Sequence, residues 1–161
     1  MIMRKGFTLI EILIVVAIIA ILATIVLVGL GPAQQSGRDA RRLSDLSAIQ
    51  IGLEFYHSKC GYYPGAVQAA SPCGVFSSAG FVAMKASITG SALGINAIPD
   101  DPTSGVHYEY ATNAGGASYI LGAKLENANN SVFATYTAPP TAGYTNGDAL
   151  TCASPYYCIT I

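Results

Sequence analysis

The chain opens with a long apolar run that one acidic residue, Glu11, interrupts near its start. Residues 12–30 carry no charge and consist of Ile, Val, Leu and Ala apart from one Thr and one Gly. A helix over residues 7–31 would be about 37 Å long, which is sufficient to cross a bilayer core of about 30 Å. A secretory signal peptide has a shorter apolar region, of about 7–15 residues. The pattern therefore predicts a membrane-spanning helix over residues 7–31.

A second helical pattern follows over residues 32–58. Apolar side chains recur at helical spacing on one face, whereas Ile51 and Phe55 lie elsewhere on the circumference. The residues on the first face are Leu43, Leu46, Ile49, Leu53 and Tyr56. One face can therefore cover a sheet while the other meets a neighbouring molecule. Gly61 and Pro64 predict the end of this amphipathic helix.

A proline separates the two helical patterns. Pro32 follows Gly29 and Gly31. Proline inside a helix removes one hydrogen bond and bends the backbone, and glycine loosens it. We therefore expect any kink or melted stretch of the helix near residues 29–32.

The remaining residues, 59–161, are predicted to form a small globular domain with an antiparallel sheet. Residues 106–113 alternate with a period of two, a turn rich in Gly and Ala follows them, and residues 118–126 come next, which is typical of an antiparallel β-hairpin. The further expected elements are a short helix around residues 80–91, turns at 98–105 and strands at 131–137 and 156–161. The predicted fold class is α+β, in which a long N-terminal helix packs on a small antiparallel β-sheet.

Charge is sparse and nearly balanced. Charged residues make up 11% of the chain, and the net charge is −1. From Cys60 onward there are two lysines, no arginines and five acidic residues, so nucleic-acid binding would need a local patch and stays unknown. One mixed cluster is expected to be solvated helix surface, with pairing between subunits as the alternative. Its members are Arg38, Asp39, Arg41, Arg42 and Asp45.

All four cysteines follow the apolar run: Cys60, Cys73, Cys152 and Cys158. An even number of cysteines after a membrane segment predicts disulfides in an oxidising compartment, and this places the N-terminus in the cytoplasm. Three pairings are possible. We favour Cys60 with Cys73 and Cys152 with Cys158, because both close short loops. A zinc site is the weaker interpretation, because the spacings differ from those of structural zinc sites.

Catalytic patterns are missing from the sequence. It contains none of the common nucleophile, phosphate-binding or metalloprotease motifs. His57 is interpreted as a surface residue and His107 as a structural one, and Asp100 and Asp101 as turn residues. We therefore predict no catalytic residue, no metal and no cofactor, and a protein that is not an enzyme.

The stretch RKGFTLIEILIVVAIIAILATIV resembles the N-terminus of type IV pilins and of type II secretion pseudopilins, the class III prepilin signal. The resemblance is strong over about the first 30 residues and continues weakly through DARRLSDLSAIQIGLEFYHSKCGYYPG. It implies a leader at residues 1–6, cleavage between Gly6 and Phe7, and N-methylation of Phe7 by the same prepilin peptidase. It also implies that Glu11, in the membrane, pairs with the N-terminal amine of an adjacent subunit. Some pseudopilins bind calcium near the loop after the hairpin, where Glu126 is here a weak candidate ligand.

The resemblance implies the type IV pilin fold and a structural subunit of a pilus-like filament. The expected partners are further copies of the chain in a helical homopolymer, the peptidase and methyltransferase, and an inner-membrane assembly platform. The precursor would be a single-pass inner-membrane protein, and the product an extracellular or periplasmic filament for adhesion, motility or DNA uptake. The first alternative is the major pseudopilin of a type II secretion system. A more distant alternative is an anchored binding domain that never polymerises.

Overall fold

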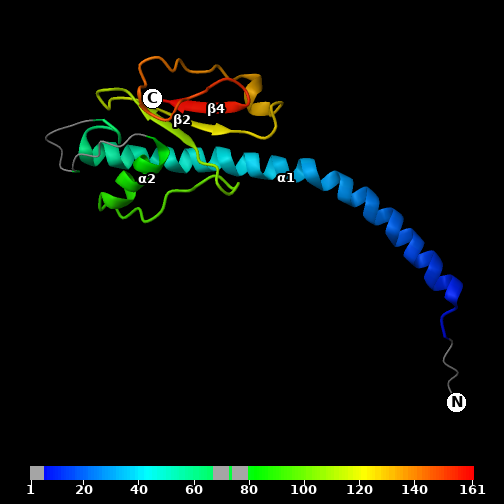
Figure 1. Ribbon diagram of the computed structural model, residues 1–161. Coiled ribbons are helices and arrows are strands. Elements are labelled where there is room, and N and C mark those ends of the chain that lie inside the picture. The colour runs from blue at the N-terminus through cyan, green and yellow to red at the C-terminus, as the bar shows by residue number, and fades with distance from the viewer. Residues whose placement is uncertain (1–5, 67–72, 74–79) are drawn as a thin grey trace. The chain divides into compact units, whose positions relative to one another are not determined.

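The computed structural model describes residues 6–66, 73 and 80–161. It divides into two compact units, Met1–Gly37 and Arg38–Ile161, and one helix, α1 (Leu9–Cys60), contributes to both (Figure 1). The described backbone remains helical through Gly29 and Pro32, so it contains no melted stretch there, whereas the segments Leu9–Ile25 and Leu30–Cys60 are bent by 40° at the break between them. The physical reason is that a single proline removes only one hydrogen bond from a long helix.

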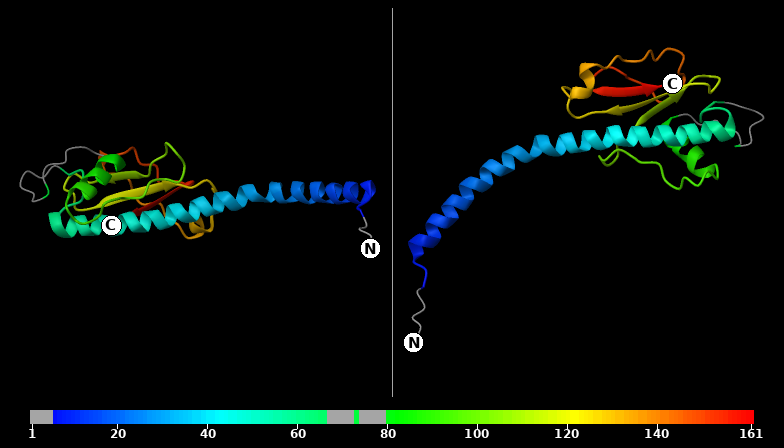
Figure 2. Two further views of the ribbon diagram at one scale, coloured as in Figure 1. Left: turned by 90° about the horizontal axis from the view of Figure 1, so that it is seen from below. Right: turned by 180° about the vertical axis from the view of Figure 1, so that it is seen from behind.

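The second unit combines the C-terminal part of α1 with one antiparallel sheet (Figure 2). Its remaining elements are α2 (Phe81–Gly90), β1 (Glu109–Thr112), β2 (Tyr119–Lys124), the 3-10 helix η1 (Ser131–Ala134), β3 (Asn146–Gly147) and β4 (Tyr156–Thr160). The strand order is β3-β1-β2-β4, and every neighbouring pair is antiparallel. The α+β fold class is therefore confirmed.

The core lies between α1 and the sheet, where the helical spacing of the sequence predicted it. Leu46, Ile49, Leu53 and Tyr56 are at most 1% exposed, and Leu43 is half-buried. The four buried residues pack in one apolar cluster with sheet residues such as Tyr110, Tyr119 and Leu121. Each fully buried aliphatic side chain contributes about 1.5–3 kcal/mol.

On the other faces of α1, Ile51 and Phe55 are 59% and 58% exposed. The predicted division of this helix into a sheet-covering face and an outward face is therefore confirmed in the second unit.

The predicted hairpin is β1 and β2, which pair from Glu109 with Gly122 to Thr112 with Tyr119. Its turn packs on the segment that leaves α1. The Tyr63 N–H donates to the Gly116 carbonyl at 2.8 Å. Gly116 has φ +66°, and a side-chain carbon there would come within 2.6 Å of the Ala66 methyl group, so this position requires glycine.

One predicted strand is wrong. Residues 131–137 contain η1 instead of a strand, because Asn130 turns the backbone there. Its side chain accepts the Val132 N–H at 3.1 Å, and its carbonyl accepts the Phe133 N–H at 3.0 Å. The further strand beside the hairpin is β3, which pairs with β1. The predicted helix at residues 80–91 and the predicted last strand are confirmed as α2 and β4.

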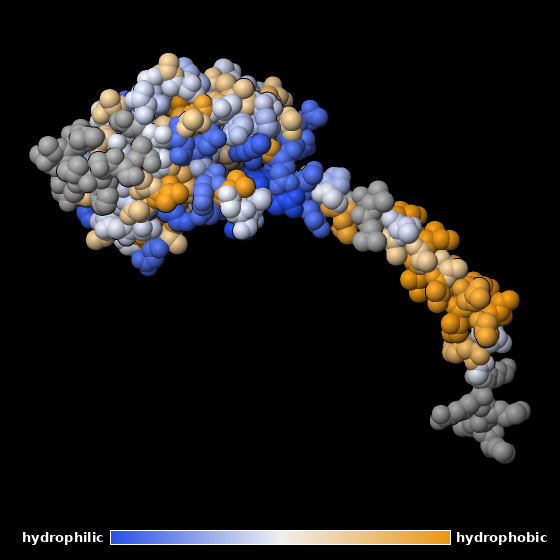
Figure 3. Space-filling view, viewed as in Figure 1, coloured by the Kyte–Doolittle hydropathy of each residue, from blue (hydrophilic) through white to orange (hydrophobic). Residues whose placement is uncertain are grey.

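The first unit contains the N-terminal part of α1. All of its described side chains from Phe7 to Ile25 are exposed, and the large aliphatic ones are 51–83% exposed. Figure 3 shows this stretch mainly in the colours of apolar residues. Among the described residues no single helix is long and apolar enough to cross a membrane, although the consecutive segments Leu9–Ile25 and Leu30–Cys60 together meet that criterion by length and composition.

Candidate functional site

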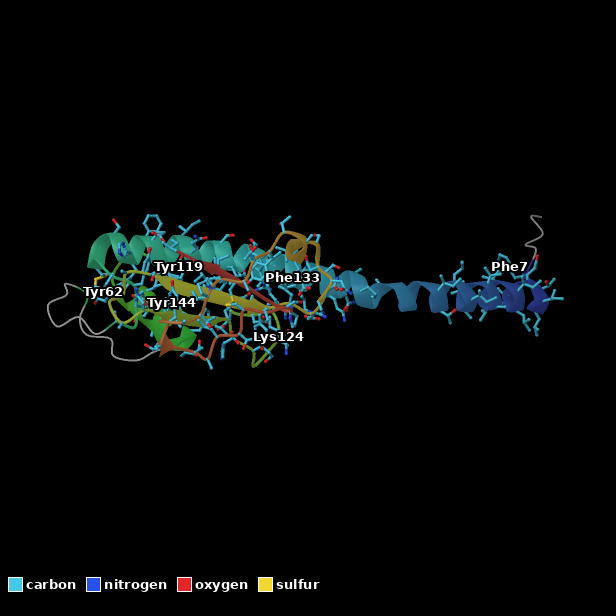
Figure 4. The ribbon with its side chains drawn as sticks, turned by 90° about the horizontal axis from the view of Figure 1, so that it is seen from above. Phe7, Tyr62, Tyr119, Lys124, Phe133 and Tyr144 are labelled. Atoms are coloured by element: carbon cyan, nitrogen blue, oxygen red, sulfur yellow. A yellow bond between two sulfur atoms is a disulfide. The ribbon has the colours of Figure 1, made fainter. Side chains whose placement is uncertain are left out.

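The candidate site is the start of α1, where the expected cleavage and assembly residues lie. Gly6, Phe7 and Thr8 precede the helix in backbone without regular secondary structure. The Phe7 side chain is 84% exposed at this end of α1 (Figure 4). Most of the expected leader, residues 1–5, lies outside the described residues. The bond between Gly6 and Phe7 therefore lies in exposed, non-helical backbone, which is a conformation that a peptidase can bind.

Thr8 and Glu11 form a reciprocal cap at the beginning of α1. The Thr8 N–H and the Thr8 hydroxyl each donate to Glu11 Oε2 at 2.7 Å. The Glu11 N–H donates back to Thr8 Oγ1 at 3.3 Å. This is the capping box of a Thr that precedes a helix and a Glu three residues later, and the carboxylate is also favourable at the positive end of the helix dipole.

The cap is a function of Glu11 that the sequence analysis missed. Its signal was present in the letters TLIE, since Thr followed three residues later by Glu before an apolar run is typical of a helix start. The resemblance implies only that Glu11 is an anion in the membrane that pairs with the N-terminal amine of an adjacent subunit. In the single chain its carboxylate instead satisfies backbone and hydroxyl donors of Thr8.

The charged cluster near residue 40 is only partly solvated helix surface: Arg41 is 62% exposed, as expected, whereas Asp39 and Arg42 are buried, which corrects the expectation for these two residues. Asp39 and Arg42 have side chains that are 0% and 3% exposed. Arg42 Nε and Nη2 donate to the two carboxylate oxygens of Asp101 at 2.7 and 2.9 Å, and Nη1 donates to Asp39 Oδ1 at 2.9 Å and Glu126 Oε1 at 2.8 Å. Asp39 lies three residues before Arg42 on α1, whereas Asp101 and Glu126 come from the loops before β1 and after β2, so adjacent residues in the sequence could not reveal these two partners.

The cluster joins three separate segments. Asp39 accepts the backbone N–H groups of Glu126 and Asn127 at 2.9 and 3.0 Å. Arg38 donates to both oxygens of Glu126 at 2.7 and 2.6 Å. Hydrogen bonds from Arg38 and then Arg42 lower the pKa of Glu126 to about 2. Burial raises the pKa of Asp101, but the hydrogen bonds from Arg42 and Thr103 and the charge of Arg42 together outweigh it, so the Asp101 pKa is also lowered.

Asp101 also accepts a hydrogen bond within its own turn. As expected for a turn residue, its Oδ1 accepts the Thr103 N–H two residues later, at 2.7 Å. Asp100 lies outside this cluster and contacts Lys85 at 2.6 Å and His107 at 2.8 Å. His57 stacks on Tyr63 with ring centroids 4.5 Å apart.

Both favoured disulfides are present in the structure. Cys60 is bonded to Cys73, and Cys152 is bonded to Cys158. Part of the first loop lies outside the described residues. The second loop lies against the outer side of the sheet, where Cys152 and Cys158 form a buried cluster with Ile120.

No group of three or more His, Cys, Asp or Glu side chains in the described ranges is arranged to hold a metal ion. The buried carboxylates of Asp39 and Asp101, and that of Glu126, instead accept hydrogen bonds from other groups of the chain.

Comparison with known proteins identifies the N-terminal region. Residues 1–27 match the family model of the prokaryotic N-terminal methylation motif. This is the signature of type IV pilins and pseudopilins, as the sequence analysis recognised, and it supports a pilin-like or pseudopilin precursor. It points to a structural subunit and implies processing by a prepilin peptidase and a membrane-anchored precursor. The searches of curated proteins and of solved structures each found no match.

Proposed function

We propose that the protein is a structural subunit of a type IV pilus-like filament, assembled from an inner-membrane precursor with its N-terminus in the cytoplasm. The match of residues 1–27 to the methylation motif is the observation that carries this proposal. In this proposal residues 1–6 are the leader, residues 7–31 form the filament core after assembly, and residues 59–161 form the outer globular domain. Residues 32–58 connect the two as an amphipathic helix.

The processing step has a defined location. Cleavage after Gly6 would create an α-amino group on Phe7, one residue before the Thr8 N–H that donates to Glu11. The new cation would then lie near the positive end of the helix dipole, where a positive charge is unfavourable. An anion of a neighbouring helix would relieve this repulsion, and Glu11 of an adjacent subunit is the proposed partner.

Glu11 is proposed to set the register of assembly. Apolar side chains exposed along the first unit can pack closely between subunits, and they supply most of the contact area. A charge pair adds little net stability in such a place, but a mismatched charge in an apolar environment is strongly unfavourable. Subunits that align amine and carboxylate are therefore favoured over all other offsets.

Glu11→Gln tests this role and separates it from helix capping. Glutamine at the same position can still accept the Thr8 N–H, but it carries no charge. We expect normal leader removal and methylation by mass spectrometry of the N-terminal peptide, together with a loss of at least about tenfold in sheared filaments, the equivalent of about 1.4 kcal/mol. The control is Thr24→Val, which removes a hydroxyl that bonds only to the Ile21 carbonyl of its own helix. Filaments at the wild-type level from Glu11→Gln would refute the charge-pairing account.

The alternative is the major pseudopilin of a type II secretion system. The buried segment Tyr62, Tyr63 and Pro64, held by a hydrogen bond of 2.9 Å from the Tyr110 hydroxyl to the Pro64 carbonyl, belongs to the stretch that resembles both families. Deletion of the coding sequence discriminates them. Loss of surface filaments with unchanged enzyme export supports the pilus, and loss of enzyme export supports the pseudopilus.

A further inference from the structure

Arg42 occupies the place in the second unit where acidic groups from three segments converge. Besides its contacts with Asp39, Asp101 and Glu126, its Nη2 donates to the Thr103 hydroxyl at 2.9 Å. Its guanidinium group is therefore surrounded by oxygen atoms of the chain, in a side chain that is 3% exposed. An oxygen-rich environment of this kind is also what a bound calcium ion requires.

The loop after β2 does not fit a calcium ion. Glu126 was the candidate calcium ligand, and its two oxygens accept hydrogen bonds from Arg38 and Arg42 at 2.6–2.8 Å. A divalent cation at these oxygens would lie against two guanidinium groups, and the Coulomb repulsion would be large in a partly buried position. The positive charge at this loop is thus supplied by the chain itself.

We propose that Arg42 is the built-in cation of this fold, which holds the loops before β1 and after β2 on α1, so that the second unit needs no divalent cation for its stability. This inference does not depend on the proposed filament function. The balance of charged groups around Arg42 supports this inference. Three carboxylates face two guanidinium groups, and the carboxylate of Asp39 additionally accepts two backbone N–H groups of the loop after β2.

Arg42→Met should differ from the wild-type protein in how its stability depends on calcium. Methionine keeps an unbranched stem but removes the charge, so three carboxylates would be left with Arg38 alone. Like charges at close range are unfavourable. The three carboxylates are not arranged to hold a metal ion while the guanidinium group lies between them, but without it they can move together around a calcium ion. The variant should therefore acquire a dependence on calcium that the wild-type protein lacks.

The test is thermal unfolding of the full-length chain in detergent, followed by near-ultraviolet circular dichroism, in millimolar calcium chloride or in a chelator. The wild-type protein should have the same Tm in both buffers. Arg42→Met should unfold about 10 °C lower in chelator, the size expected for breaking a buried ion pair, and calcium should recover part of this loss. The matched control is Arg41→Met, one position earlier, because Arg41 is 62% exposed and contacts Asp45 only at 3.6 Å. It should be unchanged in both buffers.

Two results would overturn the inference. A saturable rise of the wild-type Tm with calcium would mean that the unit uses a divalent cation. An equal loss of Tm for Arg42→Met in calcium and in chelator would mean that the packing of the side chain, and not its charge, stabilises the unit.

If Arg42→Met does not fold in chelator, Arg42→Lys replaces it. That variant should have an intermediate Tm without a response to calcium, and a response to calcium would again contradict the inference.

Discussion

Asp148 joins the segment before β4 to the start of α2, and its replacement should destabilise the second unit strongly. Its Oδ2 accepts the Phe81 N–H at 2.8 Å and the Tyr110 N–H at 3.0 Å. Phe81 is the first residue of α2, and the preceding residue, Gly80, offers no side chain to cap the helix. Asp148 therefore acts as the N-terminal cap of α2 from a distant part of the chain.

The size of the effect follows from burial. Phe81 and Tyr110 are 1% and 0% exposed, and a pocket lined by Phe81 and the half-buried Asp148 lets some water reach this place, so in Asp148→Ala the cost for each donor should lie in the lower half of the usual range. A buried donor without a partner costs about 1–3 kcal/mol, and two such donors give a loss of about 3 kcal/mol, or about 10 °C in Tm. The matched control is Asp100→Ala. The Asp100 side chain is 37% exposed and contacts Lys85 and His107, and exposed pairs of this kind contribute about 0–1 kcal/mol.

The assay is urea unfolding of the full-length chain in detergent. Ten tyrosines and no tryptophan make near-ultraviolet circular dichroism of tyrosine the suitable signal, since several tyrosines lie in the core of the second unit. Far-ultraviolet signals would be dominated by α1. A loss for Asp100→Ala that equals or exceeds the loss for Asp148→Ala would refute the reasoning, because the exposed ion pairs would then outweigh the buried backbone donors.

Three further predictions concern other parts of the second unit. Leu53→Ala should lower the free energy of unfolding by about 2–5 kcal/mol and Ile51→Ala by less than about 0.5 kcal/mol, and equal losses would contradict the assignment of the two faces of α1. The pKa of Glu126 is lowered from 4.5 to about 2, so its ionised carboxylate should stabilise the folded protein fully above about pH 4.5, and this stabilisation should be lost as the pH falls toward 2. When the free energy of unfolding in urea is measured against pH, it should therefore fall less steeply with acid in Glu126→Gln than in the wild-type protein. Identical slopes in the two proteins would show that Glu126 does not contribute. Replacing Cys152 and Cys158 by Ala should lower the free energy of unfolding by about 2 kcal/mol, the loop-closure value for a short loop. Unchanged stability would show that the other contacts of this loop hold it in place without the disulfide.

Local patterns in the sequence predicted much of the fold. The spacing of Leu46, Ile49 and Leu53 identified the face of α1 that packs on the sheet, because a helix repeats every 3.6 residues. The β1–β2 hairpin was also predictable, since the period-2 alternation of residues 106–113 leads into a turn whose Asn and Gly residues favour tight backbone. In both cases the information lies within a few residues along the chain.

Interactions between distant segments could not be predicted in the same way. Arg42 and Asp101 are far apart in the sequence, and a charged residue on a helix is usually solvated, so its burial depends on where the loops return. The apolar letters of residues 131–137 suggested a strand, but composition alone does not provide a neighbouring strand with which to pair. The cap formed by Thr8 and Glu11 differs from these interactions, because its two residues are three positions apart and the sequence was sufficient to predict it.

The hairpin turn has a consequence for the order of folding. Asn113 and Ser118 close it with a backbone hydrogen bond at 3.1 Å, a side-chain hydrogen bond at 2.9 Å and a further contact from Asn113 Oδ1 to the Ala117 N–H at 2.9 Å. Joining β1 to β2 therefore closes only a short loop, whereas β3 and β4 must return across much longer stretches of chain, which is entropically more demanding. We expect the hairpin to form first and to serve as the template on which the two outer strands are added. Pulse-labelling hydrogen exchange during refolding would reveal this as protection of the Ile120 amide, whose partner on β1 is Ala111, before the amides of Leu121 and Ile159, which are partners across β2 and β4, and the reverse order would refute it.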